Sequence, residues 1–188
     1  MNAPSTSSAP ASDAQVLGAR DALLKRIRAW LGAFVIGLVL SGLTAFPLPW
    51  EVSILAQMLR WPPLAGLSQS IGLTGWIDRV LSALLYNERH FPFMAYGTDW
   101  LAFAHLVIAS AFLGPWRDPV RNRWVIEWAM LACVSVFPLA LIFGPLRGIP
   151  LGWRVIDCCF GVFGMLPLWL VRRDILQLEA LEAVPSSP

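Results

Sequence analysis

Two ionisable side chains that could take part in chemistry interrupt long uncharged segments of this chain. His105 stands six residues after Asp99, and Asp157 stands four residues after Trp153. At a helical rise of ~1.5 Å per residue, His105 is about 9 Å and Asp157 about 6 Å inside its apolar segment. A charged group is costly to bury in an apolar environment unless it is paired. We therefore expect both side chains to contact a polar partner or a ligand.

Three further charged residues border the same ends of these segments: Asp99, Arg147 and Arg154. Arg154 precedes Asp157 by three residues, a spacing that places both on one face of a helix. We expect Asp157 to face the segment of His105 and to contact His105, Arg154 or both. The sequence thus predicts an intramembrane polar cluster of Asp99, His105, Arg147, Arg154 and Asp157.

A second polar pair is expected at the opposite end of the segments. Arg123 and Glu127 are four residues apart, so they face each other on a helix. A proton relay or a transporter needs titratable groups that link both ends. Only the weakly polar Ser135 and Cys133 lie between this pair and the cluster around His105. Transport therefore stays a minor hypothesis.

The cluster around His105 is compatible with a structural or a binding role. In the structural interpretation, His105 bonds Asp157 or a backbone carbonyl and fixes helix register. Ala102 and Ala109 would let another helix approach closely. In the binding interpretation, the histidine and the carboxylate hydrogen-bond a quinone or a lipid headgroup. A haem site with two axial histidines is disfavoured, because the only other histidine, His90, lies in a different environment.

The remaining reactive residues give no recognisable catalytic or metal site. Cys133, Cys158 and Cys159 all fall in apolar segments, where cysteine behaves as a small hydrophobe. Adjacent residues on a helix project about 100° apart, so Cys158 and Cys159 do not form a usual redox pair. No zinc spacing, nucleophile elbow, phosphate loop or dinucleotide glycine pattern occurs. We expect no metal and no other cofactor, and we favour a protein without enzymatic activity.

The segments that position these residues are those of a membrane protein. The 188-residue chain is 57% hydrophobic and 14% charged, with a net charge of +2. Soluble proteins contain about 25% charged residues, and so small a net charge does not indicate a nucleic-acid partner. Four segments approach the roughly 20 residues that cross a bilayer: 29–50, 99–116, 124–146 and 153–171. The first exceeds the apolar region of a signal peptide, so we expect it to be retained. The predicted fold is an all-α, integral membrane four-helix bundle.

Basic residues and tryptophans predict the orientation of this bundle. Nine basic residues border one side of the spans: Arg20, Lys25, Arg26, Arg28, Arg117, Arg121, Arg123, Arg172 and Arg173. Five are spread over the other side, so both termini are expected in the cytoplasm. Eight of the ten tryptophans fall at or near span ends, where indole prefers the headgroup level.

Outside the spans, the sequence predicts one external loop and two tails around a membrane domain of residues 19–173. Loop residues 51–98 contain amphipathic helices that would lie in the membrane interface, separated by the breaker WPPLAGL, which could also be re-entrant. The Ser-, Ala- and Pro-rich residues 1–18 read as a disordered cytoplasmic tail. Residues 174–188 are expected to be a short cytoplasmic tail, and RRDILQLEALEA, residues 172–183, is expected to form a short amphipathic helix at the cytoplasmic surface.

Several strings resemble a group of uncharacterised bacterial multi-pass membrane proteins. They are YGTDWLAFAHLVIA, GPWRDPVRNRWVIEW, FGPLRGIPLGWRVIDC and FGVFGMLPLWL, within residues 91–173. The resemblance implies a bacterial inner-membrane protein and brings no activity, ligand or catalytic residue.

These observations favour an accessory, scaffold or partner-binding membrane protein. The alternative is a small-molecule carrier or membrane enzyme that uses His105 and Asp157 in an outer-leaflet pocket for a quinone or a lipid headgroup. The expected partners are the lipid bilayer and other membrane proteins or further copies of the chain. Nucleic acid is not expected.

Overall fold

The computed structural model describes residues 13–183, whose regular structure is helical. The long elements are α1 (Asp13–Ala45), α5 (Ala95–Ala111) with its continuation α6 (Leu113–Arg117), α7 (Arg123–Pro138), and α9 (Leu151–Glu182). Helix α7 continues into a short π-helical segment, η2 (Leu139–Phe143), and α8 (Gly144–Leu146). Between α1 and α5 lie α2 (Leu48–Leu59), α3 (Pro62–Ser70), α4 (Leu73–His90) and the 3-10 turn η1 (Pro92–Met94).

Four stretches of the described chain are long and apolar enough to cross a membrane: Ala14–Ala45, Pro92–Arg117, Arg123–Leu146 and Leu151–Glu182. Each overlaps one predicted span. The first helix ends at Ala45 and not at residue 50, because Pro47 cannot extend the backbone hydrogen-bond ladder. Large apolar side chains cover the outside of these helices, and Phe160 and Phe163 of α9 are 68% and 71% exposed. Such a surface is suited to lipid.

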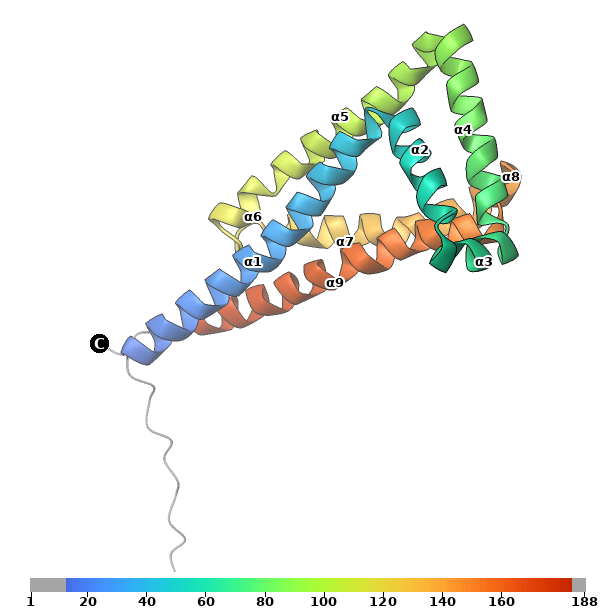
Figure 1. Cartoon of the computed structure of the whole chain (residues 1–188). Coiled ribbons are helices and arrows are strands. Elements are labelled where there is room, and N and C mark those ends of the chain that lie inside the picture. The colour runs from blue at the N-terminus through green and yellow to red at the C-terminus, as the bar shows by residue number, and fades with distance from the viewer. Residues whose placement is uncertain (1–12, 184–188) are drawn as a thin grey trace, which may run out of the picture.

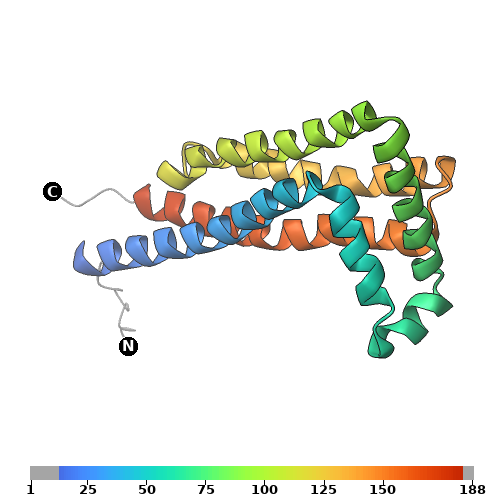
Figure 2. The same ribbon diagram turned by 45° about the horizontal axis from the view of Figure 1, so that its top comes forward.

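The four long helices form two pairs that converge at one end and diverge at the other. Helix α1 packs against both α5 and α9, and α7 packs against α9 (Figure 1). The start of α1 and the end of α9 lie together at the convergent end, which we call the termini end. At the other end, the loop end, α2, α3 and α4 bridge from the α1–α5 pair to the start of α9 (Figure 2).

Two separate apolar cores stabilise this arrangement. The larger core joins α1, α7, α9 and the residue after α5 at the termini end: Leu23, Ile27, Leu31, Phe112, Val125, Ile126, Ala129, Leu168, Val171, Ile175 and Leu178. The smaller core joins α2 to α4, with Trp153 of α9 packed against it: Val52, Ala56, Leu59 and Ile77. The helices between α1 and α5 therefore have a core of their own and a contact with the last span.

Glycines allow the closest approaches between helices. A Cβ on Gly161 of α9 would lie 2.7 Å from the backbone oxygen of Cys133 on α7, and one on Gly164 would lie 2.9 Å from its Sγ atom. A Cβ on Gly42 of α1 would lie 3.0 Å from the Cβ of His105 on α5. Small residues at such crossings let membrane helices pack closely. These glycines determine the positions along the helices at which α7 contacts α9 and α1 contacts α5.

Helical structure extends into segments for which the sequence predicted other conformations. Helix α1 begins at Asp13, within the expected tail 1–18, and residues 1–12 and 184–188 lie outside the described part of the chain. The segment after Val171 continues α9 and packs Ile175 and Leu178 into the larger core, in place of a separate surface helix. The breaker WPPLAGL starts α3, because proline is well tolerated in the first turn of a helix.

Candidate functional site

A fully buried carboxylate lies at the centre of the termini end. Asp174 is 0% exposed, because it shares a stripe of α9 with Val171 and Leu178, which face the larger core. Arg26 of α1 donates a hydrogen bond from Nη2 to Asp174 Oδ1 over 2.8 Å. Arg173 places its own Nη2 3.3 Å from the same oxygen. The side chain of Asp174 thus joins the first and last spans by a charge-assisted contact.

A second set of charges joins α7 to α9 at the same end. Within α7, Arg123 Nε lies 3.3 Å from Glu127 Oε1, the pair expected from the sequence. Each residue of this pair also has a partner on α9. Arg172 Nε lies 3.0 Å from Glu127 Oε1, and Arg123 Nη1 lies 2.7 Å from Glu179 Oε2. The four charges alternate in sign, so each has an opposite neighbour. We call this set, with the contacts of Asp174, the ion-pair network.

The buried and exposed parts of the network differ in strength. Pairs whose side chains are partly exposed, such as Arg123 with Glu127, contribute about 0–1 kcal/mol each. Asp174 differs because it is inaccessible to solvent, and removing the partner of a buried charge costs roughly 3–5 kcal/mol. Half of the Arg26 side chain is exposed, which reduces this cost. The contact with Arg26 is therefore the one that fixes the rotation of α9 against α1.

The sequence did not predict the role of Asp174. Its position after the fourth apolar segment suggested a surface tail. A signal was present in the spacing of Val171, Asp174, Ile175 and Leu178, which places a carboxylate on the apolar face of the helix. Its oxygen Oδ2 is buried and has no hydrogen-bond partner among the described residues.

At the loop end, the structure places His105 at the contact between α5 and α1. The ring Nδ1 lies 2.8 Å from the backbone oxygen of Leu101, one turn earlier on the same helix. The Cβ atom of His105 packs on Gly42 of α1. His105 is therefore half-buried at a close helix crossing, with one ring nitrogen used by its own helix.

The other members of the expected cluster are not joined to His105 or to each other. Within residues 13–183, Asp99, Arg147, Arg154 and Asp157 form no side-chain hydrogen bond or ion pair. Arg154 lies over Gly144, where a Cβ would be 2.8 Å from its Cγ, and its Nε atom is buried without a partner. Asp157 is half-buried on α9. A shared site made of these five residues remains a prediction.

Two shallow and mostly apolar hollows lie on the described surface. One groove of about 540 Å³ lies between the start of α1 and the end of α9, and it is lined by Ala19, Ala22, Leu23, Arg26, Gln177, Ala180 and Leu181. A smaller one of about 360 Å³ lies on α7, around Leu131 and Ser135. No three metal-binding side chains gather within the described residues. Of the ion-pair network, only Arg26 lines one of these two hollows.

Four apolar helices packed together, with lipid-compatible outer faces, define an integral, multi-pass membrane protein. A comparison of the chain with protein-family models, with curated proteins and with solved structures finds no match. The class of the protein is therefore known from its own helices, and the family that its sequence resembles remains a prediction.

Proposed function

We propose that this protein is a non-enzymatic accessory, scaffold or partner-binding protein of a bacterial cytoplasmic membrane. The observation that carries the proposal is the ion-pair network. Its charged side chains are used to hold α1, α7 and α9 together. Polar groups devoted to catalysis would instead be directed at a ligand site. A rigid helical frame with an apolar outer surface is suited to holding other membrane components in place.

The distribution of basic residues supports the proposed orientation, with both termini in the cytoplasm. Contacts of Arg20 with Glu182 and of Arg123 with Glu179 bring the basic segments of α1, α7 and α9 to one end. Basic residues flanking spans are retained on the cytoplasmic side. The loop end, with α2, α3 and α4, then lies on the external side.

Cysteine labelling tests this orientation. Cysteines placed at Arg121 and Arg173 are expected to react with a membrane-impermeant maleimide only after the membrane is permeabilised. A cysteine at Arg79 of α4 should react in intact cells. The three native cysteines lie within the spans and provide the background signal. Reaction of position 121 in intact cells would contradict the orientation.

A second candidate function is a small-molecule carrier or membrane enzyme at the loop end. Asp157 is half-buried without a partner among the described residues, and the buried Nε of Arg154 is also unpaired. Together with His105, these groups offer hydrogen bonds to a quinone carbonyl or a lipid headgroup. An unpaired group in an apolar setting is a candidate for ligand binding.

Purification in a mild detergent, followed by analysis of bound proteins and small molecules, separates the two functions. The accessory role predicts a stoichiometric membrane protein that stays bound in the variants His105→Gln and Asp157→Asn. The carrier or enzyme role predicts a stoichiometric small molecule that both variants lose. Loss of such a small molecule, with the fold retained, would refute the non-enzymatic proposal.

A further inference from the structure

The basic residues of the termini end fall into two groups. Five arginines contact carboxylates: Arg20, Arg26, Arg123, Arg172 and Arg173. Four other cations make no ion pair and no side-chain hydrogen bond within residues 13–183: Lys25, Arg28, Arg117 and Arg121. All four are exposed. The first group is therefore used in contacts within the protein, whereas the second group is free to bind a ligand from outside it.

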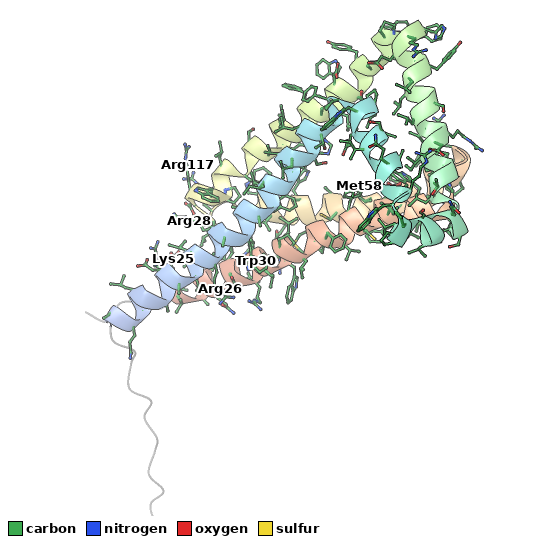
Figure 3. The ribbon with its side chains drawn as sticks, in the orientation of Figure 1. Lys25, Arg26, Arg28, Trp30, Met58 and Arg117 are labelled. Carbon is green, nitrogen blue, oxygen red and sulfur yellow. The ribbon has the colours of Figure 1, made fainter. Side chains whose placement is uncertain are left out.

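Three members of the second group, Lys25, Arg28 and Arg117, lie on one side of the bundle, where α1 meets α6 (Figure 3). Lys25 and Arg28 precede Gly32 by seven and four residues, so all three lie on one face of α1. Trp116 of α6 packs against Gly32, where a Cβ would lie 3.4 Å from its ring. Arg117 follows Trp116 directly in α6, so its backbone lies close to this contact. In Figure 3, Arg28 and Arg117 lie on the side of α1 away from α9.

Packing of aromatic rings fixes the distance between these two elements. The rings of Phe34 on α1 and Phe112 at the end of α5 have centroids 5.1 Å apart, and Phe112 is 2% exposed. Arg117 is therefore held beside α1 by buried contacts on the preceding turn. Arg121 follows in the short connection to α7, where its backbone N–H donates to Asp118 Oδ1 over 3.0 Å.

The exposed tryptophans place these cations at the level expected of lipid phosphates. Trp30 of α1 and Trp116 of α6 are 40% and 42% exposed, as expected for indoles at the boundary between hydrocarbon and headgroups. Lys25 and Arg28 lie on the termini side of Trp30, and Arg117 lies on the termini side of Trp116. Their long side chains reach the headgroup region, where basic pockets between helices bind anionic lipids.

We propose that Lys25, Arg28, Arg117 and Arg121 form a binding site for the phosphate of an anionic phospholipid. Arginine donates paired hydrogen bonds to phosphate oxygens, and lysine adds a flexible point charge. Asp118 lies within the site and Asp21 lies one turn before Lys25, so the four cations keep a net positive charge. The acyl chains would lie along the apolar side of α1 and α5. The proposal does not depend on the accessory function.

Native mass spectrometry of the full chain in a mild detergent measures this binding. Phosphatidylglycerol and phosphatidylcholine are titrated separately onto the protein and onto the variant Lys25→Gln/Arg28→Gln/Arg117→Gln. The control is Arg79→Gln/Arg89→Gln, which removes two cations of α4 that also lack ion pairs within the described residues, and the losses of affinity are compared per removed cation. Thermal unfolding of both variants confirms that each is folded.

We expect phosphatidylglycerol to bind more tightly than phosphatidylcholine, and each removed cation of the site to weaken it about fivefold. The control variant should retain wild-type affinity, and added salt should weaken binding to the wild type. Equal affinities for the two lipids, or equal losses in the two variants, would overturn the proposal. Displacement of the lipid by millimolar inorganic phosphate would also overturn it, since the site would then recognise free phosphate.

Discussion

The variant Gly164→Ala tests the contact between α7 and α9 where α9 packs against a side chain of α7. The new methyl group would lie 2.9 Å from Cys133 Sγ, against the 3.4 Å at which ordinary van der Waals contact begins. Overpacking of this kind costs about 1–3 kcal/mol. Replacing a helical glycine by alanine also stabilises a helix by roughly 0.5–1 kcal/mol. The expected net loss in the free energy of unfolding is therefore about 0–2.5 kcal/mol.

A double-mutant cycle with Cys133→Ala isolates the steric part of this loss. Removal of Sγ takes away the atom that the new methyl group meets, so Gly164→Ala should be stabilising in the Cys133→Ala background. The coupling energy between the two substitutions should equal the steric cost that Cys133→Ala removes, about 1–3 kcal/mol, which is within the range seen for residues in contact. The measurement is reversible unfolding in mixed detergent micelles, followed by circular dichroism.

Gly37→Ala on α1 is the matched control, since a Cβ there meets no atom within 4 Å. It should change stability only by the helix-propensity gain, with no coupling to Cys133→Ala. Additive effects of Gly164→Ala and Cys133→Ala would refute the proposed packing of α9 on α7. A loss in Gly37→Ala as large as that in Gly164→Ala would also refute it.

Two further predictions concern the contacts of α1. Arg26→Gln should lower the free energy of unfolding by about 1–3 kcal/mol, because the buried carboxylate of Asp174 loses its closest charged donor. The double variant Arg26→Met/Asp174→Leu should lose less in chemical denaturation, and a larger loss would contradict a burial cost at Asp174. Gly42→Ala should lower the thermal midpoint relative to Gly37→Ala, because its Cβ would lie 3.0 Å from both the Ala102 oxygen and the His105 Cβ. Equal midpoints for the two alanine variants would show that α1 and α5 separate at little cost.

The membrane helices could be predicted from the sequence because hydropathy is a local property. Each apolar segment needs no knowledge of its neighbours to be recognised. The helical extensions at Asp13 and Glu182 could not be delimited in this way, because polar helix and polar coil have similar hydropathy. Their helical form depends on packing, as the buried Ile27 and Ile175 of the larger core show.

Polar contacts within one helix could also be predicted from the sequence, whereas contacts between distant helices could not. The pair of Arg123 and Glu127 follows from a spacing of four residues on one helix. The contact between Arg26 and Asp174 joins residues 148 positions apart and depends on which faces of α1 and α9 meet. Helix spacing alone also placed Arg154 on the same face as Asp157, yet it did not reveal that Arg154 packs over Gly144. The sequence does not show which faces of distant helices meet, and these contacts depend on that.

The pairing of the first span with the last has a consequence for how the protein is made. At a ribosomal rate of about 5–20 residues per second, α1 waits on the order of ten seconds for the segment around Asp174. During this time, the face of α1 that carries Ile27 and Leu31 has only lipid, α5 and α7 as neighbours. When Asp174 is synthesised, Arg26 is already in place to receive it. A nascent chain released before α9 would therefore lack a large part of the core and expose an unoccupied α1 face, which membrane quality-control proteases can recognise.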